Sequence, residues 1–341
     1  MKSSNRDPRF ELIRLCAIAF VVAHHVLLFG VDGCGYLSPF EADMKGVVYV
    51  AANSVVVTGV NLFVMISGWF GIRRVWRPVA RLVVECAVFG AVALALSLGL
   101  SALFHVDGVD ASWAWSRLCH SVKFTNWWFV THYLMLVLLS PLLERALKDI
   151  GRRDFEAVLL AFGVFTFVFG FGWGFVNASG YNVLNFVMLY LVARYMRLFP
   201  ASPLCRFVCG RAWLTVLVCA GLMAVWFLCD TASWQPGHSC KAWNYNCPLV
   251  VAESMALFSL LLSLKPAKWN VAALSPCVLG IYLLQSSPDL VLFRNALGSW
   301  LWRECGFAGL VLAVAALLLA SLLLSAAVTA PLRFVLRKVG L

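Results

Sequence analysis

Long, nearly uninterrupted apolar segments recur along the whole chain, and no other feature of the sequence limits its fold so strongly. Of the 341 residues, 62% are hydrophobic and only 13% are charged, whereas an ordinary soluble domain has about 25% charged residues. A soluble core could not bury this much apolar surface, and large exposed patches cause association. Because a spanning helix needs about 20 mostly apolar residues, the sequence predicts an all-α, polytopic transmembrane helical bundle.

About ten segments are expected to cross the bilayer, and they use nearly the whole chain, so we predict a single domain over residues 1–341. The first is preceded by Lys2, Arg6 and Arg9 but followed by no cleavage site, so it should remain as a span. Ser286-Ser287-Pro288 predicts a break in the ninth, of a kind tolerated only against protein or a wet cavity. The predicted spans are residues 10–29, 47–70, 79–104, 127–147, 155–176, 181–199, 211–229, 248–264, 270–293 and 306–330.

Basic residues are distributed unequally between the two sides that these spans create. With the first residue in the cytoplasm, 21 of the 27 Lys and Arg residues fall on the inner side and six on the outer side. This is the positive-inside pattern, and it predicts that both termini are cytoplasmic. The net charge of +11 is spread in short runs between apolar blocks, so it indicates topology and contact with membrane lipids, and no nucleic acid is expected as a partner.

Cysteines are numerous, but their spacing predicts no metal site. The 12 cysteines include no Cys-x-x-Cys pair, and most lie in apolar segments, where a thiol acts as a small apolar group. Cys240 and Cys247 share one polar loop on the predicted outer side. An oxidising compartment there allows either a disulfide or two free thiols.

The first span carries more ionisable side chains than any other. Arg14 and His25 are eleven residues apart, which is nearly three turns, so they share one face and lie about 16 Å apart along the helix axis. Arg14 is then near the inner interface, where Glu11 can pair with it, and His25 is past the midplane. His24 is rotated by about 100° and is instead a candidate for contact with a substrate.

The chemistry of this face suggests a site that binds an anion and transfers a proton. An interfacial arginine suits phosphate because of its rigid fork of donors, and a buried neutral histidine suits general-base catalysis. The simpler alternative is that Arg14 reaches lipid headgroups while His25 hydrogen-bonds a neighbouring helix.

A second basic cluster follows the second span. Arg73, Arg74, Arg77 and Arg81 occupy nine consecutive residues. On a helical turn, Arg74 and Arg77 would converge on one ligand, and a polyphosphate is a fitting one. The alternative is a topology signal that also contacts anionic lipids.

Five further polar side chains within spans are candidates for binding a substrate. Close helix packing is the favoured explanation for Asn61, because it lies among Gly59, Gly68 and Gly71. Tyr133, near the predicted outer leaflet, could face a carbohydrate or belong to the interfacial aromatic belt. The full set is Asn61, Tyr133, Glu253, Tyr282 and Gln285.

Several segments, taken in order, resemble the acyltransferase-3 family of bacterial membrane enzymes, especially its short, stand-alone O-acetyltransferase-like members. They are ELIRLCAIAFVVAHH, NLFVMISGWF, the Arg-x-x-Arg that follows, WWFVTHYLMLVLLSPLL and GIYLLQ. The resemblance covers residues 10 to about 290. It implies about ten spans in a bacterial cytoplasmic membrane. It also implies transfer of an acyl group, often acetyl from acetyl-CoA, to a cell-surface carbohydrate or its lipid-linked precursor.

The resemblance also implies roles for individual residues. His25 would be the base or the group that handles the acyl group, while Arg14, Arg74 and Arg77 would hold the CoA phosphates with Arg73 beside them. Many relatives have histidine where this chain has Gln285, which weakens a role for the ninth span. No metal is implied.

Two functions from other classes stay open at this point. A transporter or flippase would suit the broken ninth span and the intramembrane Glu253, although no second broken helix occupies a matching position. A structural membrane subunit without chemistry is the other alternative.

Overall fold

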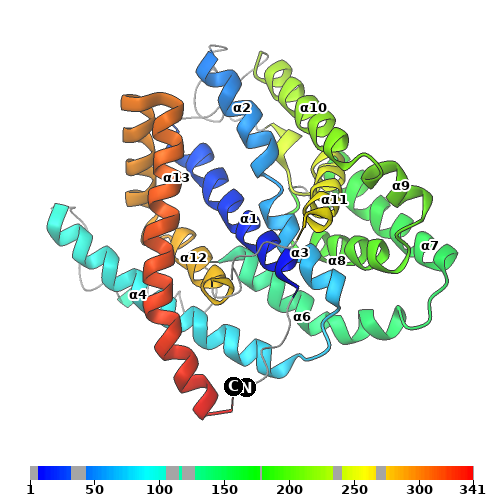
Figure 1. The fold of residues 1–341 in the computed structure, drawn as a ribbon, viewed down its shortest axis with the longest axis horizontal. Helices are drawn as coiled ribbons and strands as arrows, with labels where there is room; N and C mark the ends of the chain where they lie inside the picture. Colours follow the sequence, from blue (N-terminus) through cyan, green and yellow to red (C-terminus); the bar gives the residue numbers. More distant parts are fainter. Residues whose placement is uncertain are drawn as a thin grey trace.

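The computed structural model describes residues 7–31, 44–104, 115–116, 127–176, 179–232, 240–265 and 274–340. Its helices pack around α1 (Pro8–His25), which lies between α13 (Val291–Lys338) and α3 (Gly59–Phe70) (Figure 1). α1 also contacts α11 (Pro248–Ser263) and α12 (Val278–Gln285). The span with the most ionisable side chains therefore packs against helices on several sides, and its Glu11 and His24 side chains are buried.

The other elements complete the bundle around this core. They are η1 (Val26–Gly30), α2 (Met44–Val56), α4 (Trp76–Phe104), α6 (Trp128–Ala146), α7 (Arg152–Gly163), η2 (Val164–Gly172), α8 (Val183–Leu198), α9 (Pro203–Cys209), α10 (Ala212–Ala232), η3 (Lys241–Trp243) and η5 (Ser275–Cys277). Large apolar side chains such as Phe207, Phe175 and Leu160 point outward and are exposed. A soluble monomer rarely exposes so much apolar surface, so the outer face of the bundle suits lipid.

The prediction of an all-α polytopic protein is confirmed, and each predicted span contains a helix. Within the described residues, eight helices are long and apolar enough to cross a membrane, or nine if the bent pair α8 and α9 counts as one span. The pair is bent by 101°. The remaining difference from ten arises in α13, which contains parts of both the ninth and the tenth predicted spans.

A reversal of the chain at Gly306 divides α13. A straight helix of its 48 residues would be about 72 Å long, more than twice the hydrocarbon thickness of a bilayer. Gly306 has φ 56° and ψ −132°, which is not helical, and the two arms lie side by side in Figure 1. The predicted break in the ninth span is also confirmed, because α12 ends at Gln285 and α13 begins at Val291. Residues 270–273 of that span lie outside the described residues.

Glycines on α3 allow two neighbouring helices to approach its backbone. A Cβ added to Gly59 would lie 2.8 Å from the carbonyl oxygen of Ala17 on α1. A Cβ added to Gly68 would lie 2.8 Å from the Cα atom of Tyr190 on α8. The packing explanation for these glycines is therefore confirmed.

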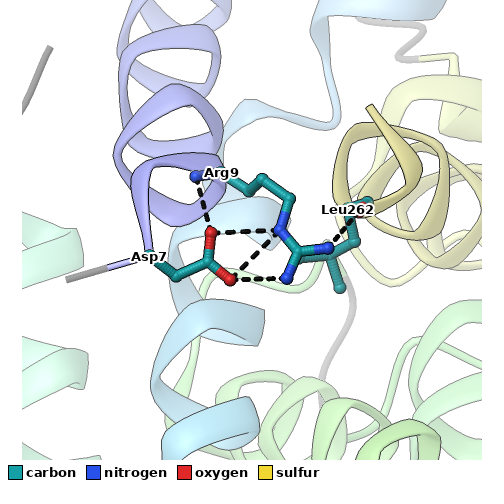
Figure 2. A network of polar contacts seen from close by, with 3 residues as sticks. All are labelled: Asp7, Arg9 and Leu262. Atoms are coloured by element: carbon teal, nitrogen blue, oxygen red, sulfur yellow. Dashed lines mark hydrogen bonds and ion pairs between the residues drawn. The ribbon is translucent and has the colours of Figure 1, made fainter. Parts of the chain in front are cut away.

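Arg9 joins the start of α1 to the end of α11 through an ion pair with Asp7 and a hydrogen bond to Leu262. The Asp7 carboxylate accepts a hydrogen bond from the backbone N–H of Arg9 (3.0 Å) and pairs with its guanidinium (2.6 Å) (Figure 2). Arg9 Nη1 then donates to the carbonyl oxygen of Leu262, 3.0 Å away in the last turn of α11. A cation at a helix C-terminus also interacts favourably with the helix dipole.

Cys240 and Cys247 are buried, and both are free thiols. The structure therefore agrees with the alternative that has no disulfide in this loop. Burial raises the pKa of Cys240 to about 12, so its thiol stays protonated at neutral pH.

Candidate active site

Two adjoining cavities open between α1, α3, α4 and α6. Their volumes are about 390 Å³ and about 440 Å³, each within the range of small-molecule sites. Arg14, Ser67 and Tyr133 contribute to the walls of both, so the two cavities lie side by side.

The entrance to these cavities is strongly basic. Arg14 pairs with Glu11 (2.7 Å) and Arg81 pairs with Glu85 (2.8 Å), so each guanidinium has a fixed position while part of its donor fork stays available. We call the five arginines that line the two cavities the basic mouth: Arg14, Arg73, Arg74, Arg81 and Arg333. Three separate parts of the chain supply them, namely α1, the α3–α4 region and α13.

A buried polar network holds the link between α3 and α4. The Tyr190 hydroxyl accepts a hydrogen bond from the backbone N–H of Ile72 (3.0 Å) and donates one to Glu144 (2.6 Å). Arg194 pairs with the other oxygen of Glu144 (2.9 Å). Gly71 ends α3 with φ 73°, and a Cβ added there would lie 2.8 Å from the Glu144 carboxylate. The network therefore fixes the residues that immediately precede Arg73 and Arg74.

Arg74 and Arg77 do not share the helical turn that their spacing suggested. α4 begins at Trp76, and the link before it is not helical because Gly71 turns the chain out of α3. Arg73 and Arg74 are on this link and line the second cavity, whereas Arg77 is exposed on the first turn of α4 and lines neither cavity. Arg81, one turn further along α4, lines the first cavity.

Beyond the basic mouth, the first cavity becomes apolar. Arg14 and Val21 line it from α1, and they are about 10 Å apart along the helix axis. α3 runs in the opposite direction, with Ser67 beside Arg14 and Val60 beyond it. We call the residues furthest from the mouth on each helix the far end: Val21, Val60, Phe129, Val130 and Tyr282.

Tyr133 lies in the wall of both cavities. Its hydroxyl and that of Ser67 are 3.0 Å apart, and its ring stacks on Phe129 with centroids 5.8 Å apart. The side chain therefore faces the interior of the bundle, where α6 begins. Trp127, which precedes it, is fully buried, and its indole N–H donates to the carbonyl oxygen of Leu283 (3.1 Å).

His25 lies one turn beyond the far end. It follows Val21 by four residues, about 6 Å along α1, and lines neither cavity. Its Nδ1 atom is 3.3 Å from Nη1 of Arg294. The same Nη1 donates to the carbonyl oxygen of Gln285 (2.5 Å), and the guanidinium lies over the Phe29 ring, 5.6 Å from its centroid.

Arg294 is a functional candidate that the sequence analysis missed. Arg294 follows the ninth predicted span and is one of the six basic residues on the predicted outer side, but its side chain is only 5% exposed. An arginine can only donate hydrogen bonds, so Nδ1 of His25 must accept this one, and a neutral imidazole then carries its proton on Nε2. The sequence does contain an indication of this buried arginine, because Arg294 lies in the mostly apolar run DLVLFRNAL at the end of the broken ninth span.

Three other sequence candidates make contacts that hold helices together. His24 Nδ1 is 2.7 Å from Asn53 Oδ1 on α2. The Asn61 amide donates to the carbonyl oxygen of Tyr245 (3.2 Å). Gln285 donates to Leu317 (3.2 Å) and so ties α12 to α13.

Glu253 is completely buried on α11 and lines neither cavity. Within the described part of the chain, neither of its carboxylate oxygens has a hydrogen-bond partner. Of the residues proposed for substrate contact, only Tyr133 and Tyr282 line the cavities.

The fold is a helical membrane bundle, and arginines line the mouth of its interior cavity. Together these features define a membrane protein with an internal site for an anionic ligand. The family model described as an acyltransferase domain, acyltransferase-3, matches residues 7–330. The chain therefore belongs to the acyltransferase-3 family, and it is a membrane acyltransferase. No curated protein and no solved structure matches it. Membership of an enzyme family favours this function over a transporter or a structural subunit.

Proposed function

We propose that the protein moves an acetyl group from cytoplasmic acetyl-CoA to a hydroxyl group of a cell-surface carbohydrate or its lipid-linked precursor. The polarity of the cavity carries this proposal. Five arginines surround its entrance, and an apolar wall leads from them to the far end. CoA has the same order of groups, with phosphates at one end and a thioester at the end of a slender arm.

The basic mouth would bind the phosphates. Arg73 and Arg74 are exposed and can meet the nucleotide part of CoA, while Arg14 borders both cavities and can contact a phosphate at the start of the arm. Guanidinium groups form strong, bidentate contacts with phosphate. Arg77, which the family resemblance also implies, would contribute from the exposed first turn of α4.

His25 is the proposed catalytic base. The acceptor oxygen bonds to the thioester carbonyl carbon, the C–S bond breaks, and CoA leaves as the thiolate. His25 takes the hydroxyl proton and returns it to the sulfur. Nδ1 of His25 is engaged by Arg294 in this structure, so the acceptor hydroxyl must replace that guanidinium at Nδ1 for the proton to move.

The acceptor would approach from the side opposite the basic mouth. His25 is past the far end in that direction, which suits a base that acts on the acceptor and not on the donor. Positive-inside topology then places the mouth in the cytoplasm and the acceptor outside a bacterial cytoplasmic membrane. Membrane lipids would surround the exposed apolar face.

The test uses purified protein in detergent, with acetyl-CoA binding measured by calorimetry and turnover by release of CoA thiol. The variants are His25→Ala and Arg73→Ala/Arg74→Ala. Arg303→Ala is a control, because Arg303 is exposed and lines neither cavity. We expect His25→Ala to bind CoA but lose about 10²–10⁴-fold in turnover. The double arginine variant should bind CoA at least about tenfold more weakly.

Two results would contradict the proposal. Full turnover by His25→Ala would show that His25 is not the catalytic base. If well-folded wild-type protein neither binds nor consumes acetyl-CoA, then acetyl-CoA is not the acyl donor.

A further inference from the structure

The Tyr282 hydroxyl is an unpaired polar group at the far end of the first cavity. The side chain is 6% exposed and lines the cavity, yet its hydroxyl has no hydrogen-bond partner in the described part of the chain. A buried polar group without a partner costs about 1–3 kcal/mol. The site is therefore one that a ligand with a hydrogen-bond acceptor would complete.

Two further donors lie around this hydroxyl. Ser286 follows Tyr282 by four residues, so it is one turn along on the same face, and its hydroxyl is also buried without a partner. The Ser286 hydroxyl and the backbone N–H of Phe129 are near enough to interact with the phenol oxygen, although neither reaches hydrogen-bond geometry. Phe129 is in the first turn of α6, and its ring centroid is 5.3 Å from that of Tyr282.

The start of α6 adds a partial positive charge. The first N–H groups of a helix have no partner within it and carry the positive end of its dipole. Trp127, the residue that caps α6, makes no side-chain hydrogen bond to them. Two hydroxyls and a helix N-terminus therefore meet at the point where the apolar part of the cavity ends.

We infer that the Tyr282 hydroxyl is a catalytic hydrogen-bond donor to the thioester carbonyl oxygen, assisted by Ser286 and the start of α6. The inference rests on the proposed function. As the acceptor oxygen bonds to the carbonyl carbon, the C=O electron pair moves onto the oxygen, which becomes an oxyanion. The donors stabilise that charge until the C=O bond re-forms and CoA thiolate leaves. Tyr282 keeps its proton throughout.

The positions of the two catalytic groups support this division of roles. His25 lies one turn beyond the far end, on the acceptor side, whereas Tyr282 lines the cavity itself. A thioester that reaches the far end would have the phenol on the donor side and the base on the acceptor side. Donors aimed at a developing oxyanion are often the largest single contribution to acyl transfer.

Tyr282→Phe separates this role from packing, because the ring contact with Phe129 is retained. We expect turnover to fall about 10²–10³-fold, with acetyl-CoA affinity within about twofold of wild type because the lost interaction forms only in the transition state. Thermal stability should be unchanged or slightly higher, since a buried unpaired hydroxyl is removed.

Tyr195→Phe is the matched control. Tyr195 is also buried, but its hydroxyl donates to Glu156 (2.6 Å) and it lines neither cavity. It should lose stability and keep its turnover. Wild-type turnover by Tyr282→Phe would overturn the inference and leave the proposed function intact. So would a loss of turnover that is matched by a loss of thermal stability. If wild-type protein neither binds nor consumes acetyl-CoA, the proposed function fails and this assignment fails with it.

Discussion

Single residues in the interior carry polar atoms that a purely structural bundle would avoid. Arg294 is buried, and the groups that accept its hydrogen bonds include a carbonyl oxygen and the His25 ring. Glu253 is buried with both oxygens unpaired within the described residues, and the Tyr282 hydroxyl is likewise unpaired. Such groups are costly in a membrane and mark function by default. Two of the three, Arg294 and Tyr282, lie at or next to the proposed path of the acyl group.

The ion pair at the start of α1 gives a pH dependence of stability. The hydrogen bond from Arg9 lowers the pKa of Asp7 in the folded state below its ordinary value. A carboxylate with a lowered pKa contributes stability that is fully present above its unfolded pKa of about 3.9 and is lost as the pH falls through the folded value.

We therefore expect Asp7→Asn to be less stable than wild type at neutral pH and equal to it at the acid end. The difference should be small because both partners are partly exposed. Thermal unfolding in detergent, followed from neutral pH to below pH 3, measures it. Asp154→Asn is the control, because Asp154 is an exposed carboxylate in the first turn of another helix, α7. A stability difference that persists unchanged at low pH would contradict the ionic explanation.

The sequence predicted some site residues well and others poorly, for identifiable reasons. Helical periodicity located Arg14, because α1 is regular from Pro8 to His25. It failed for Arg74 and Arg77, because the chain between them is not helical until Trp76. It missed Arg294, because counting charges between spans treats every such residue as solvated. Only the tertiary structure turns that side chain toward His25.

At the scale of elements, the link between α3 and α4 sets the position of Arg73 and Arg74 in the basic mouth. Gly71 and Gly174 both have a positive φ, 73° and 74°. A Cβ at Gly71 would lie 2.8 Å from the Glu144 carboxylate, whereas one at Gly174 would have no atom of the described residues within 4 Å. A comparison of alanine variants at these two glycines therefore distinguishes the effect of backbone strain, expected in both, from the effect of moving the link, expected only at Gly71.

We expect both Gly71→Ala and Gly174→Ala to lose about 1–3 kcal/mol of stability, because alanine is strained at a positive φ. Only Gly71→Ala should also weaken acetyl-CoA binding, by about three- to tenfold, because Glu144 must move and the link before Arg73 moves with it. Calorimetry and thermal unfolding measure the two effects separately. Equal CoA affinity for both variants would show that the link does not position the arginines.

At the scale of the whole molecule, each of the ten segments that hydropathy predicted contains a helix, but hydropathy could not show how the last two connect. The ninth is broken after Gln285, and its second part continues as an arm that meets η1, where a Cβ on Gly298 would lie 3.1 Å from the Cα atom of Gly30. The charged pair Arg303-Glu304 precedes Gly306, and the tenth predicted span begins at this glycine, so the sequence indicates a boundary here but not a reversal within a few residues. The reversal depends on backbone conformation, which hydropathy does not contain.

The reversal at Gly306 should therefore decide the topology of the last two crossings. Its φ of 56° with ψ −132° is open to glycine but strained by about 1–3 kcal/mol for alanine. With the basic mouth in the cytoplasm, the exposed Cys305 next to it faces outward. We expect a membrane-impermeant maleimide to label Cys305 in intact spheroplasts, with Cys305→Ser giving the background from the other cysteines. Gly306→Ala should reduce this labelling and the yield of folded protein.

Gly340→Ala is the control for that experiment, because Gly340 also has a positive φ (80°), but a Cβ there would have no atom of the described residues within 4 Å. It should leave the labelling of Cys305 unchanged. Full labelling of Gly306→Ala would show that the reversal does not depend on glycine. Labelling of wild type only after the membrane is permeabilised would instead invert the orientation, and the basic mouth would then face away from cytoplasmic CoA.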